Sequence, residues 1–350
     1  MADAEAAPAC HGPRSEPFET GSGSIGLRIG AIFILLASSA LTTLFPIVTR
    51  RVPRLTIPSS AFDFAKYFGS GVIIATAFMH LLEPGADELA SPCLNENFQE
   101  YPFAFAFAMI SLFVTFFVEL LAFRVGSKIA QRLAYDPHQG GHHHANAHGH
   151  DAQAVNGGSS PTAAMTAKGS EEDVNSVEKG FTKDQPLSAA ASEILGVAIL
   201  EFGVIFHSVI IGITLGTTSD FKILFIVIIF HQMFEGLGLG ARLSLLPLAP
   251  KSLIPYIGAI AYALVTPIGL AIGLGVRNTY NEESATANYV TGIFDSVSAG
   301  ILLYTGLVEL LAHEFIFNEK MRTAPLGKVV LNVIEMFIGA GLMALLAKWA

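Results

Sequence analysis

The chain has 350 residues, of which 52% are hydrophobic and only 14% are charged, and its net charge is −9. Soluble domains carry about 25% charged residues, so this composition excludes an ordinary soluble fold. The acidic balance also provides no basic surface for nucleic acid. Because the apolar residues gather in blocks of about 20, each long enough to cross a bilayer core, the sequence predicts a polytopic membrane protein embedded in the lipid bilayer.

Eight apolar segments define the expected all-α bundle of eight transmembrane helices. The first segment is too long for the core of a signal peptide and has no basic region directly before it, so we interpret it as a retained span. The chain then divides into a tail (1–24), spans one to three (25–133), a long loop (134–188) and spans four to eight (189–350). The spans run over Ile25–Val48, Phe62–Leu82, Tyr101–Val125, Ala190–Gly216, Phe221–Leu239, Pro255–Val276, Tyr289–Ala312 and Leu326–Ala347.

Lysine and arginine alternate from loop to loop, 15 on one side of the membrane and 5 on the other. Because the side richer in these residues faces the cytosol, we expect both termini on the non-cytosolic side. Cys10 and Cys93 then share an oxidising compartment. The sequence leaves open whether they form a disulfide or remain two separate thiols.

The loop 134–188 is rich in Gly, Ser, Ala, Asn and acidic residues, and we expect it to be disordered because few apolar residues repay its ordering entropy. Six of the eleven histidines fall within 13 of its residues. Such a tract can gather Zn²⁺ weakly without a fold, which suggests a cytosolic metal trap; a low-complexity linker is the alternative. The six are His138, His142, His143, His144, His148 and His150.

Spans four and five contain a repeat with ionisable residues at membrane depth. The 12-residue segments beginning at Ile205 and Ile229 agree at six positions, including His207 and His231. Such a repeat in antiparallel helices places equivalent residues near a pseudo-two-fold axis at the midplane. Glu235 lies four residues after His231 and shares its helix face. A lone histidine would suggest a helix-to-helix hydrogen bond, but two imidazoles and a carboxylate with room for water favour a site for a divalent metal such as Zn²⁺.

These motifs resemble the ZIP (Zrt-, Irt-like protein) family of metal importers, in particular its fungal and plant branch. The resemblance extends over Ile25–Ala350 and rests chiefly on spans four and five. The matching segments are His207–Gly212, His231–Gly236, His80–Leu82, Ser91–Leu94 and Ala299–Tyr304, together with Glu309.

The resemblance implies transport of Zn²⁺, with Fe²⁺ or Mn²⁺ as alternatives, into the cytosol, and we expect a plasma-membrane location and no catalytic cofactor. It further implies that a metal site forms between spans four and five. His207, His231 and Glu235 would be its ligands, and Ser208 and Gln232 stand where some relatives hold a second metal.

The sequence departs from those two-metal relatives at Ile211, where they carry a glutamate. As side chains that could help to hold a second metal, the sixth span offers only Tyr262 and Thr266, and no carboxylate. We therefore expect one metal at high occupancy. A homodimer is left open.

Further ionisable residues suggest an entrance. His80, Glu83 and Asp87 follow one another at spacings of three and four near the external end of span two, before an acidic loop without Lys or Arg. A mouth of one charge sign would concentrate cations, although solvated acidic loops are common. Glu201 lies on nearly the same stripe of span four as Ser208, either as a step of the path or as a carboxylate paired with another helix.

Glu309, His313 and Glu314 end span seven on the cytosolic side and suggest an exit, for which an ordinary interfacial helix end is the alternative. An enzyme is not expected, because an intramembrane zinc protease needs H-E-x-x-H and the sequence lacks it. A metal-sensing receptor that binds without transport would share every ligand and remains the alternative function.

Overall fold

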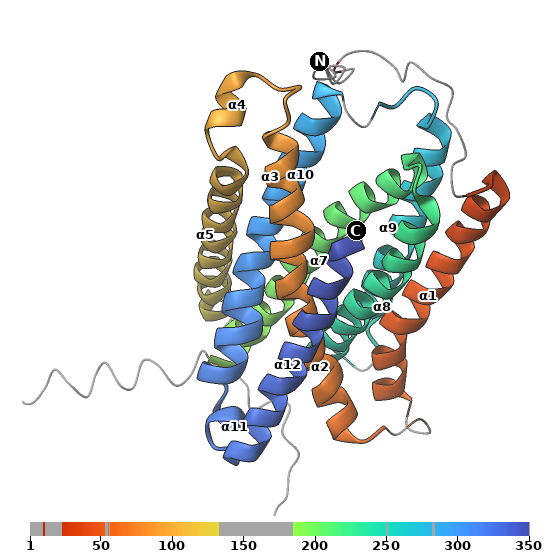
Figure 1. Ribbon diagram of the computed structural model, residues 1–350. Helices are drawn as coiled ribbons and strands as arrows, with labels where there is room; N and C mark the ends of the chain where they lie inside the picture. Colours follow the sequence, from red (N-terminus) through yellow and green to blue (C-terminus); the bar gives the residue numbers. More distant parts are fainter. Residues whose placement is uncertain are drawn as a thin grey trace, which may run out of the picture.

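The computed structural model describes residues 10, 23–52, 55, 57–132, 185–249, 251–281 and 284–349. Nearly the whole tail 1–24 and most of the loop 134–188, including all six of its histidines, therefore lie outside the described residues. The described part is all-helical and contains no strand (Figure 1). Its helices are α1 (Ile25–Arg51), α2 (Ser59–Ala75), η1 (Thr76–Leu82), α3 (Glu83–Leu89), α4 (Glu96–Glu100), α5 (Phe103–Arg132), α7 (Gln185–Thr217), α8 (Phe221–Leu245), α9 (Ile254–Val276), α10 (Ala285–Tyr304), η3 (Thr305–Phe317), α11 (Glu319–Arg322), α12 (Leu326–Leu346) and η4 (Ala347–Trp349).

Eight continuous helices of this described part are long and apolar enough to cross a membrane, which confirms the eight predicted spans. Several run further than expected. The second continues from α2 through the π-helical segment η1 into α3 and ends at Leu89 instead of Leu82, and the fifth ends at Leu245 instead of Leu239. The fifth helix passes through Arg242 because the guanidinium is neutralised inside the protein by Glu314. A charged residue therefore does not end the helix there.

Local signals set several helix ends. The hydroxyl oxygen of Ser24 accepts a hydrogen bond from the Leu27 amide and begins α1, and Ser284 does the same for α10 with the amide of Ala287. Pro255 stands in the first turn of α9, where its missing amide proton costs nothing.

The helices pack in pairs that do not follow the order of the chain. The helix α7 lies along α9, α8 lies along α1, and α2 lies along α12, while α10 packs between α5 and α3 (Figure 1). Consecutive helices α7 and α8 touch each other over a shorter stretch. The two metal-site helices are thus held mainly by partners from other parts of the chain.

Glycines allow the closest of these approaches. A Cβ atom on Gly69 of α2 would lie 2.1 Å from the Cα of Gly238 of α8, and one on Gly212 of α7 would lie 2.5 Å from the carbonyl oxygen of Thr266 of α9. Large apolar side chains meanwhile cover the outside, as on α5, where Phe113 is 61% exposed. This distribution suits a protein surrounded by lipid, where small residues rather than apolar burial bring helices together.

Candidate metal site

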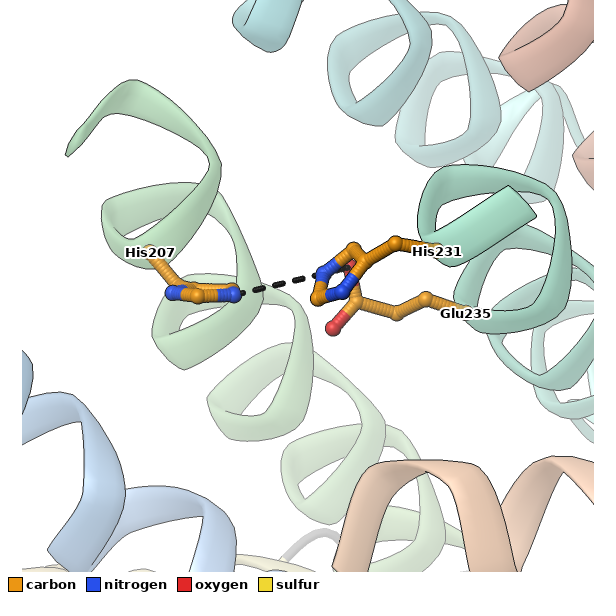
Figure 2. A group of neighbouring side chains, drawn as sticks. All are labelled: His207, His231 and Glu235. Carbon is orange, nitrogen blue, oxygen red and sulfur yellow. Dashed lines mark hydrogen bonds and ion pairs between the residues drawn. The ribbon is translucent and has the colours of Figure 1, made fainter. Parts of the chain in front are cut away.

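Three of the predicted ligands meet inside the bundle. The Nε2 atoms of His207 on α7 and His231 on α8 are 3.3 Å apart, and Glu235 Oε2 lies 3.9 Å from His231 Nε2 (Figure 2). One ligand atom from each residue can be chosen so that all lie within 4.8 Å of one another. At most 1% of any of these residues is exposed. We refer to these three residues as the His-His-Glu cluster.

The cluster retains polar atoms that the protein itself does not satisfy. Among the described residues, His207 Nδ1 and Glu235 Oε1 have no hydrogen-bond partner, although both are buried. Buried polar atoms without a partner are rare in folded proteins and usually indicate a ligand or water. Two imidazoles and a carboxylate are also the donor set that Zn²⁺ prefers when it keeps an open coordination position. The chemistry of the cluster therefore fits a divalent metal ion.

The two further residues of the predicted site differ in their surroundings. Gln232 is turned toward α9, where its amide donates to the Thr266 hydroxyl and its carbonyl oxygen accepts from the Tyr262 hydroxyl. Ser208 is fully buried, and its hydroxyl has no partner among the described residues. Gln232 thus contacts helix α9, whereas the hydroxyl of Ser208 remains unused.

Tyr262 of α9 connects Gln232 to the cluster. Its hydroxyl lies 2.9 Å from the backbone carbonyl oxygen of Gln232 and 3.3 Å from Glu235 Oε2, and the residue is completely buried. A hydroxyl in this position restricts the orientation of the carboxylate. The spacing of residues along α9 could not reveal this contact, because it depends on how α9 is rotated against α8.

His80, predicted near the entrance, lies directly at the cluster. Its ring packs edge-on against the ring of His231 with 4.8 Å between centroids, and its Nε2 atom lies 3.1 Å from the carbonyl oxygen of Met343. His80 belongs to the π-helical segment η1, whose extra residue per turn shifts the face on which it lies. Three imidazoles are therefore neighbours in the centre of the bundle.

A cavity of about 240 Å³ opens from the cluster toward the end of the bundle where the Cys10–Cys93 disulfide lies. We call it the termini-side cavity. His80, His207 and His231 line it, as does the predicted entrance residue Glu83. Asp87 is exposed and is not among its lining residues. Two further carboxyl residues line this cavity: Glu88, which begins the acidic stretch expected at the entrance, and Asp295, which the sequence analysis did not select.

A second cavity, of about 170 Å³, lies at the opposite end of the bundle, and we call it the loop-side cavity. The predicted exit residues Glu309, His313 and Glu314 all line it, but none of the three cluster residues does. The cluster thus borders only one of the two cavities. Glu201, predicted as a step of the path, borders neither cavity and has its carboxylate against Gly258 of α9.

A group of ion pairs stands at the loop-side cavity. Glu314 Oε1 lies 2.6 Å from Arg242 Nη1, and the other carboxylate oxygen pairs with Lys66. Arg242 Nη2 also donates to the Ser70 hydroxyl over 2.7 Å. These contacts tie α2, α8 and η3 together below the cluster, so Glu314 neutralises two cations instead of being a free exit ligand.

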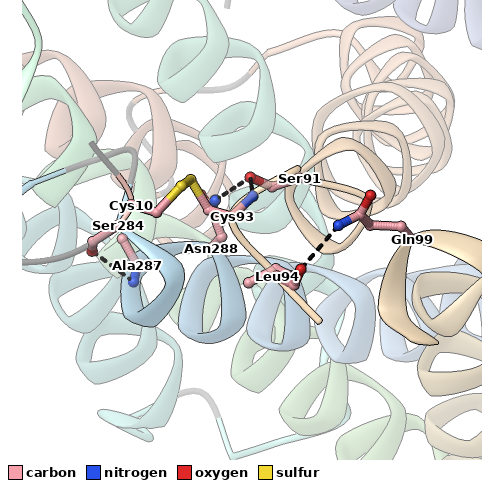
Figure 3. Close-up of a disulfide and its surroundings, with 8 residues drawn as sticks. All are labelled: Cys10, Ser91, Cys93, Leu94, Gln99, Ser284, Ala287 and Asn288. Carbon is pink, nitrogen blue, oxygen red and sulfur yellow. Dashed lines mark hydrogen bonds between the residues drawn. A yellow bond between two sulfur atoms is a disulfide. The ribbon is translucent and has the colours of Figure 1, made fainter. Parts of the chain in front are cut away.

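The two cysteines form a disulfide that joins the N-terminal tail to the turn after α3, with 5.1 Å between their Cα atoms (Figure 3). The carbonyl oxygen of Cys10 accepts a hydrogen bond from the Ala285 amide, and the Asn288 side chain donates to the Ser91 hydroxyl over 2.6 Å. Cys10, the turn after α3 and the start of α10 are thus linked at this end of the bundle. Of the two alternatives that the sequence left open, the structure has the disulfide.

Comparisons with known proteins agree with this architecture. The family model described as "ZIP Zinc transporter" matches residues 25–347. The chain is 42% identical to zinc-regulated transporter 1 of Saccharomyces cerevisiae, over 94% of this chain and 89% of that protein. It is 37% identical to zinc-regulated transporter 1 of Schizosaccharomyces pombe, over 99% and 90%, and 32% identical to Fe(2+) transport protein 2 of Oryza sativa, over 93% and 86%. The chain is therefore a multi-pass integral membrane protein that belongs to the ZIP zinc transporter family.

Proposed function

We propose that this protein imports divalent metal ions, Zn²⁺ above all, across the plasma membrane into the cytosol through the His-His-Glu cluster. The observation that carries the proposal is the buried cluster of His207, His231 and Glu235 at the end of a cavity in a bundle of the ZIP family. Relatives named as zinc transporters and one named as an Fe(2+) transport protein support the same class of cargo. Zn²⁺ and Fe²⁺ both accept imidazole and carboxylate ligands, so Fe²⁺ is a second cargo.

The direction of transport follows from the orientation of the chain. The 15-to-5 division of Lys and Arg supports a non-cytosolic position for both termini. The disulfide at the termini-side end supports it as well, because disulfides persist in oxidising compartments. The termini-side cavity is then the external one, and this conformation receives metal from outside. A cytosol-negative potential of about 100 mV favours influx of a 2+ ion by about 4.6 kcal/mol, so no chemical energy source is required.

The residues around the cluster take supporting roles in this proposal. His80 completes the external side of the site, and Glu83 borders the cavity through which the ion arrives. On the loop side, Glu309 and His313 border the cavity through which the ion leaves after Glu314 separates from its cations. The six loop histidines would collect the ion in the cytosol, and neither an enzymatic activity nor a catalytic cofactor is part of the proposal.

Uptake of radioactive zinc into proteoliposomes tests the proposal. The wild type is compared with His207→Ala, His231→Ala and Glu235→Ala, and Glu319→Ala serves as a matched control because this carboxylate is exposed on α11. Each ligand variant should lose at least about tenfold in apparent metal affinity, since even residues that only support a metal ligand are worth that much. Unchanged uptake in all three variants would remove the cluster from the pathway. Metal binding without flux in the wild type would identify a receptor instead.

A further inference from the structure

One oxygen of a buried carboxyl group in the termini-side cavity has no hydrogen-bond partner among the described residues. Asp295 of α10 is only 5% exposed, and its Oδ1 atom makes no hydrogen bond to any described residue. The side chain lines the same cavity as His207 and His231. Neither lysine nor arginine is among the described residues that line this cavity.

A second carboxylate stands beside it. Glu88 of α3 lines the same cavity and lies close enough to Asp295 for the two side chains to interact electrostatically. A Cβ atom on Gly292 of α10 would lie 3.1 Å from the Cβ of Glu88, and one on Gly85 of α3 would lie 2.9 Å from the Ser296 hydroxyl oxygen. Each carboxyl residue follows its glycine by three positions. The close approach of the two helices is therefore what brings the two acids together.

A buried carboxyl group such as that of Asp295 needs a compensating positive charge inside a membrane protein. An isolated buried charge is costly to desolvate, and like charges placed together add to this cost. A bound cation or a shared proton would remove it. The position favours the cation, because the cavity leads to three imidazoles and carries ions of that charge in the proposed function. Carboxylate oxygens are also suitable ligands for a divalent ion that keeps part of its water shell.

We propose that Asp295 and Glu88 form a loading site, which holds a partly hydrated divalent metal ion before it loses its water at the His-His-Glu cluster. The loading site contributes oxygen ligands only, whereas the cluster contributes mainly nitrogen. An arriving ion thus exchanges water for carboxylate first and for imidazole second. This inference rests on the proposed function for its role in transport, but binding of an ion there can be measured without transport.

Equilibrium dialysis of the full-length protein against radioactive Zn²⁺ measures the loading site directly. The parent carries His207→Ala and His231→Ala, so the cluster is disabled, and Asp295→Asn is added to it. The loop histidines are present in both proteins, so any Zn²⁺ that they bind contributes equally to both measurements and does not affect the difference between them. We expect Asp295→Asn to remove one bound Zn²⁺ per chain at saturation. Glu319→Gln, at an exposed acid of α11 that does not line the cavity, should leave binding unchanged. Identical binding curves with and without Asp295→Asn would overturn the proposal.

Transport measurements on proteins with an intact cluster distinguish a metal ion bound by Asp295 and Glu88 from a proton shared between them. Asp295→Asn and Glu88→Gln should each raise the KM for Zn²⁺ about tenfold, because a cation-attracting mouth raises capture by at least this factor, while the maximal rate is kept. Asp295→Glu should restore the KM. An unchanged KM with a shifted pH profile would identify a shared proton and refute the loading site. If Asp295→Asn does not fold, Glu88→Gln replaces it in both assays with the same expected outcomes. Absence of zinc flux in the wild type would refute the proposed transport function but not the loading site, because the dialysis experiment measures zinc binding without transport.

Discussion

The hydroxyl of Tyr262 offers a sharp test of how the metal site is held. Replacing Tyr262 with Phe keeps the ring that fills the space between α8 and α9 and removes only the hydroxyl. This hydroxyl lies within hydrogen-bonding reach of the backbone carbonyl of Gln232, its side-chain oxygen, and Glu235 Oε2 at 3.3 Å. The variant therefore leaves an acceptor of Gln232 or Glu235 unpaired in a buried site.

The magnitude follows from the complete burial of this group. A buried acceptor without its donor costs about 1–3 kcal/mol. Loss of a group that orients a metal ligand typically lowers metal affinity about 10–100-fold, which corresponds to about 1.4–2.8 kcal/mol. Both ranges describe the loss of one hydrogen bond at a buried group. We therefore expect Tyr262→Phe to raise the KM for Zn²⁺ by about 10–100-fold.

Zinc uptake into proteoliposomes gives the KM, and thermal unfolding in detergent gives the stability of the same preparations. Tyr256→Phe is the matched control, because it removes a hydroxyl from the same helix at a residue that does not touch the cluster; its ring packs under Arg51. The control should leave the KM unchanged. A KM within twofold of the wild type for Tyr262→Phe would refute the positioning of Glu235 by this hydroxyl. A loss of stability with an unchanged KM would assign Tyr262 to packing alone.

Three further outcomes are expected. Glu314→Gln removes the negative charge that pairs with both Lys66 and Arg242, so the free energy of unfolding should fall by about 3 kcal/mol, visible as a lower melting temperature in detergent; an unchanged melting curve would contradict the ion-pair network. The double variant Cys10→Ser/Cys93→Ser should melt at the temperature of the reduced wild type and below the oxidised one, because a link across 83 residues restrains the unfolded chain. Uptake should decrease as the external pH falls toward about 5, since protonated imidazole does not bind metal; a rising uptake would indicate proton coupling.

The sequence alone was sufficient to predict the eight spans and the residues of the cluster. Lipid requires each spanning segment to be apolar and helical, so the spans appear as blocks, and any ionisable residue inside a block stands out. His231 and Glu235 share a helix face at a spacing of four, and the repeat at His207 supplied the partner from the other helix. Both signals lie within single helices, where the helical period relates position to direction.

The tertiary structure decided what faces these residues from other helices. The spacing of residues along the chain does not show how α9 is rotated against α8, or α10 against α3. The contact of Tyr262 with Glu235 and the proximity of Glu88 to Asp295 could therefore not be predicted from the sequence. His80, which lies within the π-helical segment η1, likewise meets His231 in a contact that its position in the chain did not predict. The sequence determined which side chains lie at membrane depth, because lipid penalises every charge there. Packing between helices determined which of them meet, because glycine contacts fix how closely each pair of helices can approach.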